Sequence, residues 1–272
     1  VVGAMRDVAG RNRDTAKALS AHGAQVVEMD VSDDASVKAG VAMASDQLGG
    51  VDVVIHGAGV GVIGLQEAFT AADMQRLFDV NVFGVHRVNR ELLPAWRARR
   101  SGLMINISSL LGRVTMPFYG PYNASKWALE ALSENYRSEL SGWGIEVCIV
   151  EPGGYATSFM HNLMRPSDGA RTESYGEMAA APQAFLEVFE HHLAATPAQD
   201  PQRVADAVAS LLAMPARQRP LRTTVDSLGM GAATQVVGVR SALGLGGLGC
   251  LVCGLAAFAW VAWRQPAATG RQ

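Results

Sequence analysis

The sequence is poor in cysteine and in net charge, and each shortage narrows the classes of protein that it can encode. Its 272 residues contain three cysteines and carry a formal net charge of −2. So few cysteines do not make a disulfide framework, which indicates a reducing compartment and a cytoplasmic location. A charge near zero gives no electrostatic basis for binding nucleic acid. Cys250 and Cys253 form a C-x-x-C without a second pair, so we expect no metal site.

Apolar, β-branched runs alternate with helical stretches along most of the chain. This rhythm predicts one α/β domain over 1–235, with a Rossmann-like, doubly wound parallel sheet covered by helices on both faces. The expected strands are 1–5, 24–31, 51–59, 102–109, 145–154 and 219–226, and the expected helices are 11–22, 33–48, 67–99 (two segments ending near Pro94 and the arginines that follow it), 121–141 and 200–213. The rhythm stops at about 155–198, which we expect to be an irregular substrate lid beyond a strand's carboxyl end.

An apolar tail follows the domain. Residues 242–263 carry no charged side chain, a length sufficient to span a bilayer as a helix. Arg240 and Arg264 bracket this run, and Trp260 and Trp263 lie near one end, as interfacial anchors do. Its many glycines lower helix propensity, so a segment that docks on the domain is the alternative to a transmembrane helix.

Tyr122 and Lys126 lie four residues apart in a helix-forming run, so they share one helix face. A nearby ammonium stabilises a phenolate and lowers its pKa, which would let the tyrosine exchange a proton with an alcohol or carbonyl oxygen. Taken alone, the pair is common by chance and is more typical of two surface residues on a helix. Polar or small residues at other strand ends favour an active site: Ser109 after 102–109, and Gly57 to Gly59 after 51–59.

The motifs together resemble the short-chain dehydrogenase/reductase family, in its single-domain branch, from Val1 to about residue 226. They are "DVSD" (30–33), "HGAG" (56–59), "NVFG" (81–84), "NISS" (106–109), "YNASK" (122–126) and "PGGYAT" (152–157). The resemblance implies a nicotinamide cofactor and reversible hydride transfer between a carbonyl and an alcohol. Within the family, the general features of the sequence resemble those of hydroxysteroid and retinol dehydrogenases.

The resemblance also implies a role for each matching residue. Tyr122 would be the general acid/base, and Lys126 would bind the nicotinamide ribose and lower the pKa of Tyr122. Ser109 would orient the substrate oxygen, and Asn81 would hold a water that relays protons from Lys126. The implied cofactor contacts are Arg6, Asp30 and Val31 (adenine), Gly57, Ala58, Gly59, Asn81, Tyr122, Lys126, and Pro152, Gly153 and Thr157 (nicotinamide).

The choice between NADP(H) and NAD(H) rests on the end of the first expected strand. Many NAD-binding members place an acidic residue there, which would repel a 2′-phosphate. This chain has Met5 followed by Arg6, and an arginine pairs with phosphate. The residues therefore favour NADP(H); the alternative is that Asp7 accepts the ribose and Arg6 is solvated.

The chain departs from the family pattern in two places. His56 and Gly57 replace the two asparagines of the family's N-N-A-G turn, and we interpret His56 as structural, bonded to the backbone. The family's first strand and T-G-x-x-x-G-x-G loop, which holds the pyrophosphate, have no counterpart in the sequence. We therefore expect an N-terminally truncated fold that lacks its central strand and binds its cofactor poorly.

These residues favour an NAD(P)-dependent oxidoreductase. Aromatic and aliphatic residues in 155–164 and 181–189 predict a small hydrophobic carbonyl or alcohol substrate. We also expect a homodimer or homotetramer, and association with a membrane only through 242–263. The alternative is a catalytically idle nucleotide-binding or scaffold protein, because the phosphate-binding loop is absent.

Overall fold

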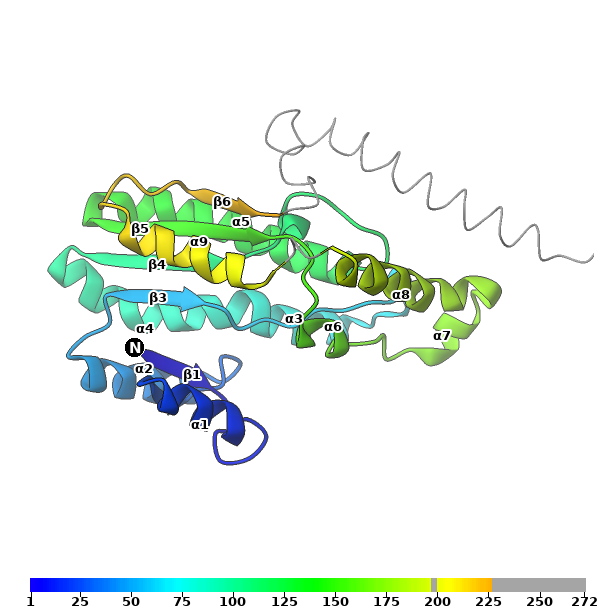
Figure 1. Ribbon diagram of the computed structural model, residues 1–272, viewed down its shortest axis with the longest axis horizontal. Coiled ribbons are helices and arrows are strands. Elements are labelled where there is room, and N and C mark those ends of the chain that lie inside the picture. Colours follow the sequence, from blue (N-terminus) through cyan, green and yellow to red (C-terminus); the bar gives the residue numbers. More distant parts are fainter. Residues whose placement is uncertain (197–199, 227–272) are drawn as a thin grey trace, which may run out of the picture.

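The computed structural model describes residues 1–196 and 200–226, shown in colour in Figure 1. The end of the expected domain, up to residue 235, and the apolar segment 242–263 lie outside these residues. None of the described helices is long and apolar enough to cross a membrane.

In the part of the chain that the structure describes, six parallel strands form two sheets. They are β1 (Val2–Met5), β2 (Gln25–Glu28), β3 (Val53–His56), β4 (Gly102–Ile107), β5 (Ile145–Pro152) and β6 (Arg222–Val225). The larger sheet has the order β3-β4-β5-β6, and β1 and β2 form a separate pair. All pairs are parallel, as the continuous apolar runs predict. The expected Rossmann-like α/β fold is confirmed.

The two sheets are not hydrogen-bonded to each other in the described part of the chain. There, β1 pairs only with β2, and β3 pairs only with β4. Figure 1 shows β1 on the β3 side of the larger sheet. Ile55, in the middle of β3, is 47% exposed, whereas Ile105 beside it in β4 is fully buried. The interruption lies where the family's first strand was expected, and the truncation itself stays a prediction.

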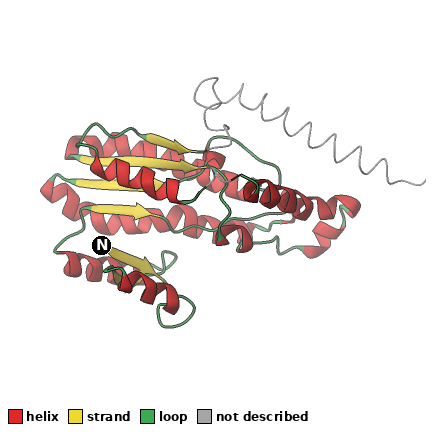
Figure 2. Cartoon of the chain, viewed as in Figure 1, coloured by secondary structure: helices red, strands yellow, loops and turns green. Residues whose placement is uncertain are grey.

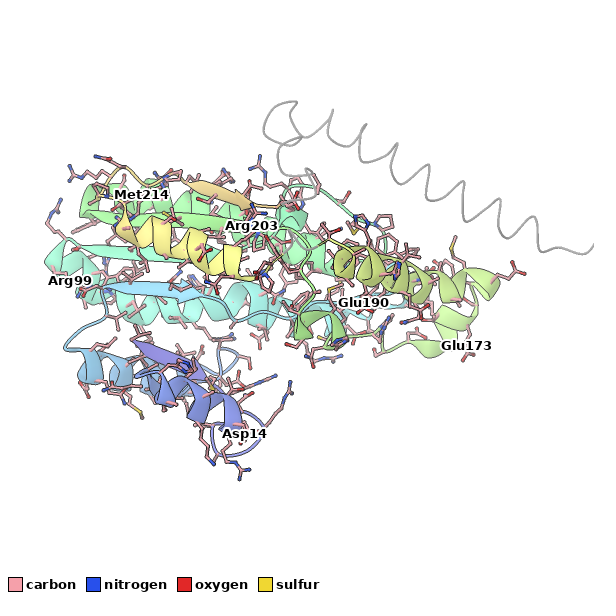
Figure 3. All side chains as sticks on the ribbon, in the orientation of Figure 1. Asp14, Arg99, Glu173, Glu190, Arg203 and Met214 are labelled. Carbon is pink, nitrogen blue, oxygen red and sulfur yellow. The ribbon has the colours of Figure 1, made fainter. Side chains whose placement is uncertain are left out.

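Helices cover both faces of the larger sheet (Figure 2). The main helices of the fold are α1 (Arg13–Ala21), α2 (Asp34–Leu48), α3 (Ala71–Phe78), α4 (Gly84–Arg99), α5 (Gly120–Leu140) and α9 (Gln202–Ala213). Of these, α4, α5 and α9 pack on the larger sheet, whereas α1 and α2 lie against the β1–β2 pair. On one face, Trp96 of α4 packs with Met104 of β4 and Val147 of β5. On the other, Leu211 of α9 packs with Cys148. Charged side chains such as the labelled Asp14 and Glu173 lie at the periphery (Figure 3).

Helix α2 joins the small sheet to the rest of the fold. Val37 and Val41 of α2 belong to the same apolar cluster as Val88 of α4. Arg87 of α4 adds polar contacts, because its guanidinium lies 2.7 Å from the carboxylate of Asp34 and donates to the carbonyl of Val31 at 3.1 Å. The small sheet is therefore held by helix packing.

The stretch predicted as two helices near 67–99 differs from the expectation in detail. A π-helical turn, η2 (Asp79–Phe83), separates α3 from α4, and Asn81 lies in this turn. Pro94 does not end a helix; it lies inside α4, which continues to Arg99. Arg100, with φ 54°, terminates α4 in the left-handed region.

The expected irregular lid is largely helical. After β5 come α6 (Ser158–His161), α7 (Gly169–Glu173), the 3₁₀ turn η5 (Gly176–Ala180) and α8 (Ala181–Ala194). The backbone of Met164 exchanges hydrogen bonds with Ile63 and Gly61, at 3.0 and 2.9 Å. The backbone N–H and hydroxyl of Ser167 both donate to the buried carboxylate of Asp73, at 3.1 and 2.7 Å. The lid is thus fastened to the segment that follows β3.

Candidate active site

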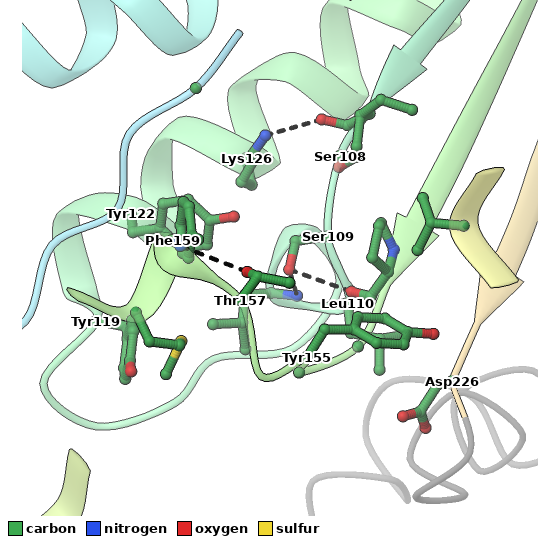
Figure 4. Close-up of a pocket in the computed structure, with 18 of the residues that line it drawn as sticks. Ser108, Ser109, Leu110, Tyr119, Tyr122, Lys126, Tyr155, Thr157, Phe159 and Asp226 are labelled. Atoms are coloured by element: carbon green, nitrogen blue, oxygen red, sulfur yellow. Dashed lines mark hydrogen bonds between the residues drawn. The ribbon is translucent and has the colours of Figure 1, made fainter. Parts of the chain in front are cut away.

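The carboxyl ends of β3, β4 and β5 and the first turns of α5 surround a cavity of about 360 Å³ (Figure 4). Such ends are where open parallel sheets bind ligands. Eight of the expected site residues line it: Gly57, Gly59, Ser109, Tyr122, Lys126, Pro152, Gly153 and Thr157. The topology therefore brings together side chains that are far apart in the sequence.

Local structure at the start of α5 sets the direction of Tyr122 and Lys126. Pro121 occupies the first turn of the helix, where its missing N–H costs nothing. The side-chain amide of Asn123 donates to the carbonyl of Met116 at 3.1 Å, which fixes the preceding loop. Tyr122 and Lys126 are 7% and 5% exposed, so the shared helix face is the buried one. The surface alternative for this pair is wrong.

Lys126 is a buried ammonium with one direct hydrogen bond. Its Nζ donates to the carbonyl of Ile107 at 2.8 Å and lies 5.7 Å from the ring centroid of Tyr122. Burial lowers the pKa of Lys126 to about 8, and the charge of Glu130 opposes this shift. An ammonium has three N–H donors, so donors remain for a ligand in the cavity.

Tyr122 is held as a neutral phenol. Burial raises the pKa of Tyr122 well above its ordinary value, and the Ser109 hydroxyl partly offsets that shift. Desolvation is the largest cause of this shift, and Lys126 Nζ lies 5.7 Å from the ring centroid; the expected lowering of this pKa by Lys126 together with a bound cofactor stays a prediction. The tilted ring of Phe159, with centroids 5.9 Å apart, forms part of the apolar surroundings of Tyr122.

Ser109 stands between the tyrosine and the end of β5. It caps the 3₁₀ turn η3 (Leu110–Gly112), where its Oγ accepts the N–H of Leu111 at 3.1 Å. The same Oγ lies 3.5 Å from the carbonyl of Pro152. Ser108, which has no cavity role in the sequence prediction, also lines the cavity; it is buried, and a Cβ added to Gly112 of η3 would lie 2.9 Å from its Oγ.

Asn81 lies behind the cavity wall and not in it. Its amide donates to the carbonyl of Val60 at 2.9 Å and to the hydroxyl of Ser125 at 3.0 Å, and its Oδ1 accepts the N–H of Val60 at 2.8 Å. A Cβ on Gly59 would lie 3.5 Å from Asn81 Oδ1 and 3.8 Å from Lys126 Nζ. Asn81 thus anchors the glycine loop beside Lys126, and its role in a proton relay stays a prediction.

The residues expected to bind the adenosine half lie away from this cavity. Arg6 follows β1, and its guanidinium is 3.8 Å from the carboxylate of Asp30, which follows β2. Hydrogen bonds from Ser32 are the main cause that holds the pKa of Asp30 below its ordinary value. The carboxylate of Asp7 accepts the N–H of Arg11 at 2.8 Å, so it stabilises a turn. The choice between Arg6 and Asp7 as the cofactor contact stays a prediction.

Val31 and Ala58 also lie outside the cavity lining. Val31 packs against Gly84, where an added Cβ would come within 2.8 Å of its side chain. His56 is buried, and its Nε2 lies 2.8 Å from Asn89 Oδ1. His56 thus has the expected structural role, but its observed partner is a side chain and not the backbone. Desolvation lowers the pKa of His56 to about 4.

Sequence reasoning missed part of the cavity wall, namely Tyr119 and Asp226. Tyr155, Phe159 and Met160 also line the cavity, and they belong to the segment 155–164 that the sequence predicts to face a hydrophobic substrate. Tyr119 is a buried side chain that belongs to none of the quoted motifs. Within residues 1–196 and 200–226, no group of three or more histidine, cysteine or acidic side chains could hold a metal ion.

Fold and site together define a Rossmann-like α/β protein with a buried tyrosine, lysine and serine at the carboxyl edge of its sheet. The family model for the short chain dehydrogenase matches residues 2–168, which is more than half of the chain. The chain belongs to the short-chain dehydrogenase family.

Individual relatives agree with this assignment. The chain is 32% identical to human retinol dehydrogenase 8 over 245 residues, which cover 84% of this chain and 77% of that protein. It is 30% identical to 3-ketodihydrosphingosine reductase of Bacteroides thetaiotaomicron over 204 residues, 75% of this chain and 73% of the relative. Among solved structures, a short-chain dehydrogenase from Streptomyces avermitilis has a TM-score of 0.70 at 27% identity, covering 98% of this chain and 89% of the other.

Actinorhodin polyketide ketoreductase, solved as a variant with NADPH, has a TM-score of 0.66 at 27% identity. The similarity covers 83% of this chain and 85% of the ketoreductase.

Proposed function

We propose that this chain interconverts a carbonyl and an alcohol, with a nicotinamide cofactor as the hydride donor or acceptor. The observation that carries the proposal is the burial of Tyr122, Lys126 and Ser109 on one cavity wall. The raised pKa of Tyr122 keeps its phenol protonated, the form that can donate a proton to a carbonyl oxygen. Ser109 lies beside it and can bond the same oxygen.

The cavity residues fit such a cofactor. The glycines Gly57, Gly59 and Gly153 place no side chain at the wall, and Lys126 has unused N–H donors for ribose hydroxyls. Pro152 and Thr157 would bracket the nicotinamide ring. When bound, the cofactor supplies the hydride.

We infer a preference for NADP(H) over NAD(H). Arg6 lies at the carboxyl end of β1 with its side chain 55% exposed, so its guanidinium can meet a phosphate. The related ketoreductase was solved with NADPH, which supports the inference. Asp30 lies close to Arg6, so the pair would have to open when a phosphate binds.

The substrate that we propose is hydrophobic. Leu111, Met116, Phe159, Met160 and Phe189 line the cavity around Tyr122 and offer little to a polar substrate. Two relatives are named for alcohols or ketones on long apolar molecules, a retinol dehydrogenase and a ketodihydrosphingosine reductase. We therefore propose an apolar carbonyl or alcohol compound.

The test is Tyr122→Phe, with Tyr119→Phe as a matched control that removes a hydroxyl from the same wall. We expect Tyr122→Phe to lower kcat for reduction of apolar ketones by about 10²–10⁴-fold, the usual contribution of a positioned acid. NADPH affinity should stay within about threefold in both variants, because one phenol hydroxyl contributes little to cofactor binding. Turnover retained by Tyr122→Phe would refute the assignment. A wild-type chain that binds NADPH but turns over no ketone would favour the idle nucleotide-binding alternative.

A further inference from the structure

A cluster of buried charges lies behind Lys126, on the side away from the cavity. Glu130 and Glu151 are 4% and 3% exposed, although both are carboxylates. The guanidinium of Arg222 in β6 donates to Glu130 at 2.9 Å and lies 3.3 Å from Glu151. Burying charge is costly unless a function or a partner compensates it, so this cluster requires an explanation beyond packing.

Glu130 is placed directly behind the lysine. It follows Lys126 by four residues on α5, so both side chains share one face of that helix. An added Cβ on Gly112 would lie 3.0 Å from Glu130 Cγ and 3.2 Å from the Lys126 carbonyl, which shows how tightly this face packs on η3. In the described part of the chain, Glu130 is the carboxylate whose charge acts on Lys126.

The second oxygen of Glu130 is not used by Arg222. Oε2 accepts from Arg222, whereas Oε1 is buried away from it. The hydroxyl of Ser108 acts on the Glu130 carboxylate from the far side of Gly112 and lowers its pKa. The carboxylate is therefore held by Arg222 and Ser108 in a region where charges interact strongly.

We propose that Glu130 is a positioning residue, which keeps the ammonium of Lys126 charged inside the buried site. The consequence for catalysis rests on the proposed function, since a charged Lys126 is what can hold ribose hydroxyls and favour the phenolate of Tyr122. Burial alone would drive Lys126 toward the neutral amine. The carboxylate one helical turn behind it opposes that change.

The other charged groups around this pair set the size of the effect. Tyr122 faces Lys126 from the same helix. Glu151 of β5 faces Glu130 and repels its charge, whereas Arg222 of β6 attracts it. Glu134, also on α5, pairs with Arg222 at the surface, with 56% of its side chain exposed.

Arg113, which follows η3, lies 3.6 Å from Glu151. Together the two arginines and three carboxylates leave an excess of negative charge behind Lys126, which favours its charged form.

The test uses the chain's three lysines, Lys17, Lys38 and Lys126. In protein labelled with ¹³C-lysine, the ¹³Cε resonances can be titrated, and the exposed Lys17 and Lys38 serve as internal references. We expect Glu130→Gln to lower the pKa of Lys126 from about 8 by roughly one unit, because it removes the carboxylate charge that favours the ammonium.

Matched variants separate charge from structure. Glu134 also pairs with Arg222, but it lies one helical turn further from Lys126 than Glu130 does. Glu134→Gln should therefore leave the pKa of Lys126 unchanged. Glu130→Asp retains the charge and should restore most of the pKa. If Glu130→Gln does not fold, Glu130→Met fills the same volume without charge and carries the same expectation.

The pH dependence of turnover supplies the second readout. The alkaline limb of the kcat/KM profile for alcohol oxidation should move to lower pH in Glu130→Gln, by the same amount as the lysine titration. A Lys126 titration that is equal in wild type, Glu130→Gln and Glu130→Met would overturn the proposal, whatever the enzyme activity. A shifted titration in a chain without turnover would support the coupling and count against the proposed function alone.

Discussion

Acid should destabilise this fold through His56, a buried imidazole at the end of β3. Its ring Nε2 lies 2.8 Å from Asn89 Oδ1, and its side chain is almost closed to solvent. Desolvation lowers the pKa of His56 to about 4 from 6.5. The perturbation is His56→Asn, which removes the titrating ring and restores the residue type of the family's N-N-A-G turn.

The sign of the effect follows from proton binding in the two states. Between about pH 4 and pH 6.5 the unfolded chain binds a proton at His56 and the folded chain does not, so stability falls as the pH falls through this range. A difference of about 2.5 pKa units corresponds to roughly 3.4 kcal/mol at full effect. About 2 kcal/mol of this is already lost when the pH falls from about 7.5 to about 5.

The assay is urea unfolding at several pH values between about 5 and 7.5, for wild type, His56→Asn and the surface control His22→Asn. Other groups titrate in the same range, and the raised pKa of Glu130 acts with the opposite sign. These contributions are common to all three proteins and cancel in the comparison. The wild type and His22→Asn should lose about 2 kcal/mol more than His56→Asn. Equal pH dependence in all three would refute the reasoning.

Two further predictions concern the lid and the cofactor. Asp73→Ala removes both part of a helix cap and the acceptor of Ser167, so the free energy of unfolding should fall by roughly 2–4 kcal/mol. As a control, Asp33→Ala removes an exposed helix cap and should lower the free energy of unfolding by about 1 kcal/mol. Equal losses for the two variants in urea titrations would contradict the contact between Asp73 and Ser167. Arg6→Ala should weaken NADPH binding about 10–100-fold and NADH binding little. Arg13→Ala is the control. If fluorescence titrations show that Arg6→Ala keeps the wild-type preference for NADPH over NADH, Arg6 is excluded as the phosphate contact.

The sheet could be predicted from the sequence because its strands are buried on both faces. Continuous apolar runs such as 145–150 leave no helical period, and Ile145, Val147 and Ile149 are indeed fully buried or nearly so. The start of another strand was predicted less accurately, since β3 begins at Val53 and the expected strand began at residue 51. Strand ends depend on pairing partners, which a single sequence does not reveal.

Pro94 shows why the helix boundary was misjudged. A proline inside a helix removes one hydrogen bond and costs about 3 kcal/mol, so the sequence favours a break there. In the structure Trp96 is 1% exposed and its indole donates to the carbonyl of Val51 at 2.6 Å. Burial of so large a side chain and its hydrogen bond offset the proline, and α4 continues. Tertiary packing of this kind has no local signal.

The candidate catalytic motifs could be found because their residues lie close together in the sequence. The residues that hold them in place lie far away in the sequence and could not be found in this way. Tyr122 and Lys126 are one helical turn apart, and Glu130 lies one turn further along the same face, so its burial beside Lys126 could have been anticipated. Its partner Arg222 lies 92 positions away, and no periodicity connects the two. The π-helical turn that directs the side chain of Asn81 toward Val60 could not be predicted from the sequence either, because it depends on tertiary contacts.

The two sheets carry different parts of the candidate site. The residues proposed for proton transfer lie on the larger sheet and α5, whereas Arg6 and Asp30 follow the strands of the β1–β2 pair. A cofactor that touches both must bridge two bodies of structure joined by α2 and α4, with no strand hydrogen bonds between them in the described residues. The free energy of the cofactor's binding therefore depends on a helix–helix contact that the chemistry at Tyr122 does not use. For that reason, damage to this contact would be expected to appear as weaker cofactor binding before it appears as slower proton transfer.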